Sequence, residues 1–331
     1  MKKSRKVIGL LGAGVLLVLA VLLLYTVGRR LETSGQSQQR GELAQTEQEQ
    51  TCVVDGVTYR KRSDIMSILV MGVDCDSTQQ SDSPYEGGQA DFQRLIVLDA
   101  AHGTVQQLKI DRDTITDVVM LGYLGSPIGT QKMQISLAHG FGDGKEESCE
   151  YAQQAVEALL GEDTVGFYLA MNLDGIPTLN DLAGGVTVTL EDDFSAMDPA
   201  MVQGATLTLH GKQAEYFVRS RMNIGEGTNE ARMVRQEAYL EQLLAQLHGQ
   251  LGQEKQRTAE VLDAMADYMV TDMPRGRMIN EICAARDYTV EPALALEGEH
   301  KIAEDGFMEF YPTESSIQQA VLELFWEPVT G

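Results

Sequence analysis

Apolar and polar positions follow one another along the chain in patterns that predict alternating strands and helices. Residues 65–73 form an almost unbroken apolar run, which is typical of a buried strand. Two further strands are predicted over 92–98 and 104–110, joined by a short turn as in a hairpin. From 149 to 161 apolar residues recur at three- and four-residue spacing, which predicts an amphipathic helix closed by glycine.

The second half of the chain continues this interleaving. Strand patterns occur over 166–171, 186–190 and 306–311. Helical periodicity occurs in six segments: 173–182, 211–219, 229–248, 261–269, 278–283 and 317–325. Since we find no internal repeat and no convincing linker after residue 62, the sequence predicts a single domain over 62–331, of the α/β or α+β class, with a mixed sheet.

The N-terminal region carries a second kind of hydrophobic pattern. Residues 7–28 contain no charge, and 22 helical residues span about 30 Å of hydrocarbon. A cleaved signal peptide is the alternative, but this apolar run is longer than a signal sequence needs and ends at a poor cleavage site. We therefore expect a retained, single transmembrane helix over 7–28.

Charges on either side of this helix predict its orientation. Four basic residues precede it and two follow it, which keeps residues 1–6 in the cytoplasm and places the rest of the chain outside the cell membrane. The polar stretch that follows is rich in Gln, Glu, Ser and Gly, so residues 29–61 are expected to be a flexible linker.

The overall charge excludes one class of partner. The chain has 26 basic and 49 acidic residues, a formal charge of −23, which repels nucleic acid. Six of the basic residues lie in the first 30 positions, which leaves 20 basic residues for the remainder of the chain. The four cysteines are widely spaced and match no zinc pattern, and the sequence leaves their pairing open.

Arginine is concentrated on both sides of a glycine-rich loop. Arg219 and Arg221 precede the loop, and Arg232, Arg235 and Gln236 follow it on one face of a predicted helix. Guanidinium groups that extend a core-facing stripe need anionic partners, and their planar fork suits phosphate oxygens. Surface ion pairs with neighbouring glutamates are the alternative.

Acidic residues at strand ends favour the phosphate interpretation. Asp74 ends the first predicted strand, Asp91 precedes the second, and Arg112 and Asp113 follow the third. Two carboxylates on neighbouring strands are suitable ligands for Mg²⁺. Oxygens of the substrate phosphate complete the coordination shell of the ion. Metal and arginines together are typical of phosphoryl transfer.

Seven short motifs occur in the order found in the LytR-CpsA-Psr family, which this chain resembles over about residues 62–250. The motifs are Ser67–Asp74, Ala90–Asp91, Ile110–Thr114, Leu182–Val186, Gly211–Ala214, Val218–Arg221 and Arg232–Gln236. The resemblance implies an αβα sandwich around a mixed central sheet, preceded by the transmembrane helix. It also implies a membrane-anchored phosphotransferase of cell wall assembly, which moves a glycopolymer such as teichoic acid from a polyprenyl-pyrophosphate carrier in the membrane lipid onto peptidoglycan.

The resemblance also assigns roles to residues. Asp74 and Asp91 match magnesium ligands, with Mn²⁺ as an alternative metal. Residues matching the pyrophosphate-binding set are Arg112, Arg219, Arg221, Arg232, Arg235 and Gln236. Asp113 is expected to orient Arg112, and the catalytic set comprises Arg112, Asp113, Arg219 and Arg221. Gln89 stands where many members have arginine, which puts an outer phosphate contact in doubt.

Two residues near these motifs receive other predictions. Arg94 is assigned to the surface, and His139 is expected to be a hydrogen-bonded structural residue in preference to a general base. Two other functions remain open. One is a non-catalytic envelope receptor or transcription attenuator that binds polyprenyl lipids, and the other is a polyprenyl-pyrophosphate pyrophosphatase.

Overall fold

The computed structural model places a mixed sheet between two layers of helices. It describes residues 50–74, 87–162, 164–220 and 254–329, together with positions 224, 225, 235, 238, 239, 242, 243, 246 and 247. The predicted transmembrane helix lies outside the described residues. Within the described part, no helix is long and apolar enough to cross a membrane.

The central sheet has the strand order β11-β8-β3-β4-β5-β12, and β13 also pairs with β5. Strands β3 and β8 are parallel, whereas β4 is antiparallel to both β3 and β5. Its strands are β3 (Ile65–Val73), β4 (Ala90–Asp99), β5 (Thr104–Ile110), β8 (Phe167–Asn172), β11 (Met269–Thr271), β12 (Thr289–Val290) and β13 (Leu294–Ala295). The predicted strands at 65–73, 92–98, 104–110 and 166–171 are therefore confirmed.

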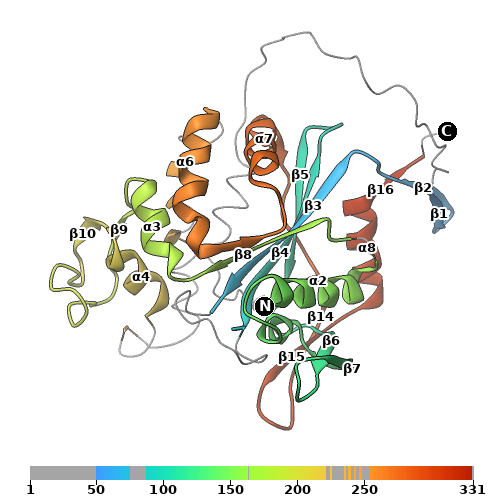
Figure 1. The fold of residues 1–331 in the computed structure, drawn as a ribbon, viewed down its shortest axis with the longest axis horizontal. Coiled ribbons are helices and arrows are strands. Elements are labelled where there is room, and N and C mark those ends of the chain that lie inside the picture. Colours follow the sequence, from blue (N-terminus) through green and yellow to red (C-terminus); the bar gives the residue numbers. More distant parts are fainter. Residues whose placement is uncertain are drawn as a thin grey trace, which may run out of the picture.

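Helices cover both faces of this sheet (Figure 1). One face is covered by α3 (Gly175–Leu182), α4 (Lys212–Arg219), α6 (Lys255–Met265) and α7 (Arg275–Ala285). The other is covered by α2 (Glu146–Leu160), α8 (Glu314–Phe325) and the 3₁₀ helix η1 (Ile135–Gly140). Another 3₁₀ turn, η2 (Ala266–Tyr268), joins α6 to β11. The arrangement is the αβα sandwich that the family resemblance implied.

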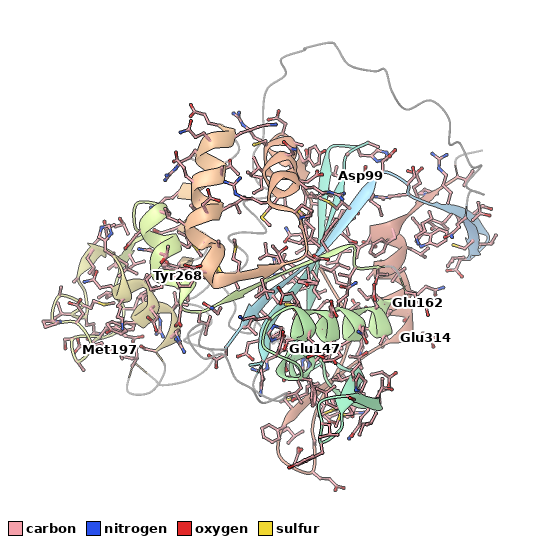
Figure 2. All side chains as sticks on the ribbon, in the orientation of Figure 1. Asp99, Glu147, Glu162, Met197, Tyr268 and Glu314 are labelled. Atoms are coloured by element: carbon pink, nitrogen blue, oxygen red, sulfur yellow. The ribbon has the colours of Figure 1, made fainter. Side chains whose placement is uncertain are left out.

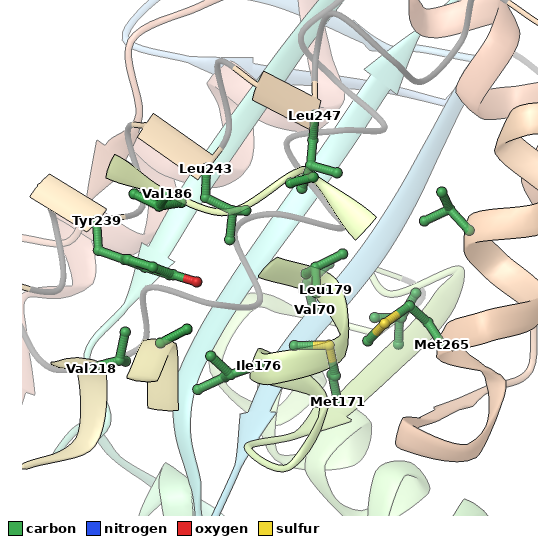
Figure 3. Packing of buried hydrophobic residues seen from close by; sticks show 14 of the residues in the cluster. Val70, Met171, Ile176, Leu179, Val186, Val218, Tyr239, Leu243, Leu247 and Met265 are labelled. Atoms are coloured by element: carbon green, nitrogen blue, oxygen red, sulfur yellow. The ribbon is translucent and has the colours of Figure 1, made fainter. Parts of the chain in front are cut away.

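The sheet has a hydrophobic core on each face, because the side chains of its strands point alternately to the two faces. Val70 and Met171 point to the α3 side and Leu69 and Ala170 to the α2 side, because successive side chains of a strand face opposite ways. On the α3 side, Val70 and Met171 pack with side chains from the helices, including Ile176 (Figure 3). Both strands are buried on both faces, so their sequences read as continuous apolar runs.

The predicted helix over 229–248 is described only in part. Its described positions are helical, and Tyr239, Leu243 and Leu247 are fully buried in the α3-side core. The Tyr239 hydroxyl donates to Asn180 Oδ1 at 3.0 Å. The burial of these positions at four-residue spacing agrees with the helical periodicity from which the helix was predicted.

Among the described residues, four smaller sheets lie around the sandwich. They contain β1 (Thr51–Val54), β2 (Val57–Lys61) and β16 (Trp326–Pro328); β6 (Ile115–Leu121) and β7 (Pro127–Gln134); β9 (Thr187–Thr189) and β10 (Thr206–Thr208); and β14 (Gly298–Ile302) and β15 (Met308–Pro312).

One sheet corrects the predicted linker. Residues 51–61, which we assigned to the linker 29–61, form β1 and β2, and β2 also pairs with β16 at the end of the chain. β1 and β2 form a local hairpin through the two-residue turn Asp55-Gly56, in which both residues have positive φ, so a hairpin signal was present in the sequence and was missed. Only the pairing of β2 with β16 joins strands that are remote in the sequence and leaves no local signal.

Candidate active site

The residues that the sequence placed at strand ends lie at one edge of the central sheet. Asp74 directly follows β3, and Asp91 is the second residue of the antiparallel strand β4. Arg112 follows the end of β5, which is antiparallel to β4 and therefore returns to the same edge. The topology thus brings together two carboxylates and a guanidinium group that are separated in the sequence.

Arg112 is the centre of a polar cluster at this edge. Its Nη1 pairs with Asp91 Oδ1, and its Nη2 donates to Gln89 Oε1 at 2.6 Å. Its Nε lies 3.5 Å from Asp113 Oδ1. The side chain remains 22% exposed, so the guanidinium group is oriented on one side and still reachable from solvent.

Asp113 is fixed by groups other than Arg112. Its carboxylate accepts from Gln134 Nε2 at 3.1 Å, and its backbone oxygen accepts from Phe310 N at 2.7 Å. Burial raises the pKa of Asp113, and the nearby Asp111 carboxylate adds to this effect while Arg112 opposes it. Because Gln134 of β7 and Phe310 of β15 hold Asp113 in place, its position supports the expected role of orienting Arg112.

Arg219 reaches the same edge from the α3 side of the sheet. It is the last residue of α4, and its Nη2 lies 3.5 Å from Asp74 Oδ1. Its Nη1 lies 3.0 Å from Glu215 Oε1 and 3.9 Å from Asp174 Oδ1. These ion pairs are solvent-accessible and individually weak, so an anionic ligand can compete for the guanidinium group.

Unlike Arg112 and Arg219, Arg235 bonds mainly to backbone oxygens. Its Nε donates to Phe217 O at 2.6 Å, its Nη2 donates to Ser220 O, and its Nη1 lies 3.5 Å from Asp192 Oδ2. The guanidinium carbon lies 5.1 Å from the centre of the Phe194 ring. Arg235 therefore supports the end of α4, and its role as an anion ligand stays a prediction. Arg221, Arg232 and Gln236 lie outside the described residues.

The carboxylates suit a metal that is bound together with a phosphate. Among the described residues, no group of three or more histidine, cysteine or acidic side chains is placed to hold a metal ion. Asp74 and Asp91 are both solvent-accessible; Asp74 follows the end of β3, and Asp91 lies at the start of the neighbouring strand β4. Mg²⁺ is commonly held by one or two carboxylates, with substrate phosphates and water completing its shell, so this pair fits it in the presence of a phosphate ligand.

The sequence analysis missed two acidic residues that pair with Arg219 at this edge, Asp174 and Glu215. Asp174 follows the end of β8, so a strand-end signal was present in the sequence. Glu215 is one helical turn before Arg219 and could have been found by its spacing. Gln89 stands where the family pattern has an arginine that would contact phosphate. In this structure its side chain accepts a hydrogen bond from Arg112 and so orients it.

Arg94 and His139 are both buried. The surface assignment of Arg94 is wrong: it lies inside β4, is 7% exposed and donates to Gln107 Oε1 at 2.7 Å. His139 is 1% exposed, and its Nδ1 lies 2.7 Å from Gly87 O. The expectation of a hydrogen-bonded structural histidine is thus confirmed.

The order of motifs and the fold agree with a comparison against known families. The profile of the LytR_cpsA_psr family matches residues 25–321. The chain belongs to the LytR-CpsA-Psr family. The matched range includes the sheet edge and α4, which supply Asp74, Asp91, Arg112 and Arg219.

Individual relatives are distant. The Bacillus mycoides polyisoprenyl-teichoic acid–peptidoglycan teichoic acid transferase TagU is 22% identical over 268 residues, 80% of this chain and 79% of TagU. A Bacillus cereus TagU is 27% identical over 160 residues, 48% of this chain, and there the chain spans 46% of the relative's length.

Solved structures share the fold. Protein gbs0355 from Streptococcus agalactiae gives a TM-score of 0.61 at 22% identity, covering 79% of this chain and 86% of that one. TagT bound to LIIa-WTA gives a TM-score of 0.53 at 19% identity, covering 79% and 89%. At this level of identity the likeness establishes the mixed α/β fold.

Proposed function

We propose that this protein is a membrane-anchored phosphotransferase that moves a glycopolymer from a polyprenyl-pyrophosphate carrier onto peptidoglycan. The observation that carries the proposal is the meeting of Arg112, Arg219, Asp74 and Asp91 at one sheet edge. Family membership, the names of the TagU relatives and the structure of TagT bound to LIIa-WTA support teichoic acid or a similar polymer as the transferred group.

The described arginines suit the recognition of a pyrophosphate. Arg112 reaches the edge from the end of β5, and Arg219 reaches it from the end of α4. Each is oriented by carboxylates yet exposed, and guanidinium groups bind phosphate oxygens through two parallel hydrogen bonds. Arg221 and Arg232 are proposed to extend this set from the neighbouring loop and helix.

The proposed reaction is a displacement at phosphorus. A sugar hydroxyl of peptidoglycan attacks the phosphorus that carries the glycopolymer, and a new phosphodiester forms. The bond from this phosphorus to the bridging oxygen breaks, polyprenyl phosphate leaves, and the hydroxyl proton passes to a carboxylate at this edge. Arg112 and Arg219 stabilise the negative charge that develops on the bridging and equatorial oxygens.

Asp74 and Asp91 are the proposed ligands of Mg²⁺. When bound, the ion supplies further neutralisation of the pyrophosphate charge. Asp91 pairs with Arg112 through Oδ1, while Asp74 faces Arg219 at 3.5 Å. The two carboxylates therefore also set the directions of the two arginines in the absence of substrate.

The experiment is transfer of a labelled lipid-linked saccharide to peptidoglycan oligomers. We expect Arg219→Ala to reduce the rate by about 10²–10³, the cost of losing one donor to the transition state. Arg275→Ala is the matched control, because Arg275 is an exposed arginine paired with Asp263 at 2.5 Å, away from the proposed site. Equal transfer by the wild type and Arg219→Ala would refute the assignment.

The same assay decides between the proposal and the two other functions. Release of phosphate without coupling to peptidoglycan would indicate a pyrophosphatase that uses water as the acceptor. Binding of the lipid without any turnover would indicate a receptor. Either result would replace the transferase proposal.

A further inference from the structure

A three-residue segment, Gly87–Gln89, connects the candidate catalytic groups to the body of the protein. We call it the strap. The Gln89 backbone oxygen accepts from Asp74 N at 3.0 Å, and the Gln89 side chain accepts from Arg112 Nη2 at 2.6 Å. The strap also leads directly into β4 and Asp91. Its position therefore affects both proposed metal ligands and Arg112.

His139 holds the strap from the layer below. It lies on η1 and is 1% exposed. Its Nδ1 is 2.7 Å from Gly87 O and 3.3 Å from Gly88 O, and since carbonyl oxygens only accept, Nδ1 carries the proton. On the other side of the ring, Nε2 lies 3.7 Å from Cys149 Sγ on α2.

The close contact between strap and η1 depends on glycine. A Cβ atom at Gly87 would lie 2.2 Å from His139 O and 2.6 Å from Ser148 Oγ, both too close for any side chain. The amide of Gly87 also donates to Gly140 O at 3.3 Å. The strap thus lies against η1 and the start of α2, and the His139 ring fixes its carbonyl groups there.

A direct role in proton transfer does not fit His139. Its ring is enclosed by protein, with one nitrogen on the strap and the other facing Cys149. Burial lowers the pKa of His139, so the neutral form with hydrogen on Nδ1 is the one that meets the carbonyl groups. Any effect of His139 on catalysis must therefore pass through the strap.

We propose that His139 is a positioning residue that fixes the strap through its Nδ1–H, and thereby sets the placement of Asp74, Asp91 and Arg112 for pyrophosphate binding and transfer. The inference rests on the proposed function for its catalytic consequence. The hydrogen bond and its effect on the strap can be tested without it. Hydrogen-bonding support of this kind decides how well a site is held in its productive geometry.

The test compares His139→Ala, His139→Asn and His139→Gln in the full chain. An asparagine amide takes approximately the place of Nδ1, whereas a glutamine amide takes that of Nε2, so only asparagine can restore the bond to the strap. We expect His139→Ala and His139→Gln to lower kcat about tenfold or more, and His139→Asn to recover most of it. We also expect weaker binding of inorganic pyrophosphate in the presence of Mg²⁺ and faster amide hydrogen exchange over 87–91 in the first two variants.

Thr116→Val is the matched control. Thr116 is 1% exposed, and its hydroxyl donates to Ala155 O at 3.3 Å without contacting the strap. It should lose stability and keep the wild-type kcat, pyrophosphate affinity and exchange over 87–91. If His139→Ala does not fold, the comparison of asparagine with glutamine carries the test.

Failure of the positioning role of His139 can be distinguished from failure of the proposed function. Unchanged exchange over 87–91 in His139→Ala, or equal behaviour of the asparagine and glutamine variants, would overturn the positioning role. A wild-type protein that transfers nothing would overturn the proposed function alone, because exchange and pyrophosphate binding still report on the strap.

Discussion

A carboxylate at the far end of β4 shows how one residue can couple folding to pH. Asp99 is 1% exposed and lies at the opposite end of the strand from Asp91 (Figure 2). It accepts from His102 N at 3.0 Å and pairs with His102 Nδ1 at 2.8 Å and with Arg62 Nη1 at 3.1 Å. Burial alone would raise the pKa of Asp99, but the bonds from His102 and the charge of Arg62 outweigh it and lower the pKa.

We therefore expect Asp99→Asn to reduce the free energy of unfolding at pH 7 by about 1.5–3 kcal/mol, the contribution of a hydrogen bond to a charged group. Because the folded-state pKa is lowered, this contribution is present above the ordinary pKa of about 3.9 and is lost as the pH falls through the folded value. Urea unfolding at pH 7 and at pH 3 measures the difference.

Asp263→Asn is the control for this measurement. Asp263 is paired with Arg275 on the surface, where water screens the charges, so its replacement should change stability little. A pH-independent difference between Asp99→Asn and the wild type would contradict the ionic contribution.

At the scale of elements, the end of α4 is held by a residue from another helix. Arg235 bonds to the backbone oxygens of Phe217 and Ser220, which belong to the last turn of α4 and its C-cap. Arg219 is the last residue of α4, so the support of Arg235 and the direction of Arg219 are linked. Lysine cannot reproduce two carbonyl bonds and the contacts with aromatic rings at once.

We expect Arg235→Lys to lower stability by about 1–2 kcal/mol, with a matching drop in Tm. Arg219→Lys is the comparison: Arg219 makes only solvent-accessible ion pairs in the described structure, so its Tm should stay near the wild-type value. Differential scanning calorimetry on both variants measures this. Equal Tm values for the two would show that Arg235 does not support α4.

Helices and strands were predicted best where their own sequence carries a clear pattern of apolar residues. The strand over 65–73 was predicted with its observed bounds, because a strand buried on both faces reads as a continuous apolar run. The hairpin β6–β7 was missed, since β7 is largely exposed and its polar sequence resembles a loop. The pairing of β2 with β16, from the other end of the chain, leaves no local signal.

At the scale of the whole molecule, charge is unevenly distributed along the chain. Six of the 26 basic residues fall in the first 30 positions, and Arg112 and Arg219 lie at the sheet edge proposed as the active site. Positive charge in this acidic protein therefore occurs at the proposed anchor and at the proposed anion site, and also in surface ion pairs such as Arg275–Asp263. An acidic exterior also disfavours binding of nucleic acid.

The proposed anchor gives a prediction about location. We expect the full chain to sediment with membranes and to resist a carbonate wash, because 22 uncharged residues span the hydrocarbon core. Deletion of residues 1–30 should release the protein into the soluble fraction. Fractionation followed by immunoblotting measures both. A full-length chain in the soluble fraction would contradict the anchor.

The sequence by itself determined the principal strands, the helices flanking them and the family, because periodicity and ordered motifs are local properties of the chain. It also selected Asp74, Asp91, Arg112 and Arg219 as chemically related. Only the tertiary structure decided which partners they have. The antiparallel return of β4 and β5 places Arg112 against Asp91, and the packing of α4 places Arg219 against Asp74. The links from Arg235 to α4 and from His139 to the strap join residues that are distant along the chain, so no local pattern could reveal them.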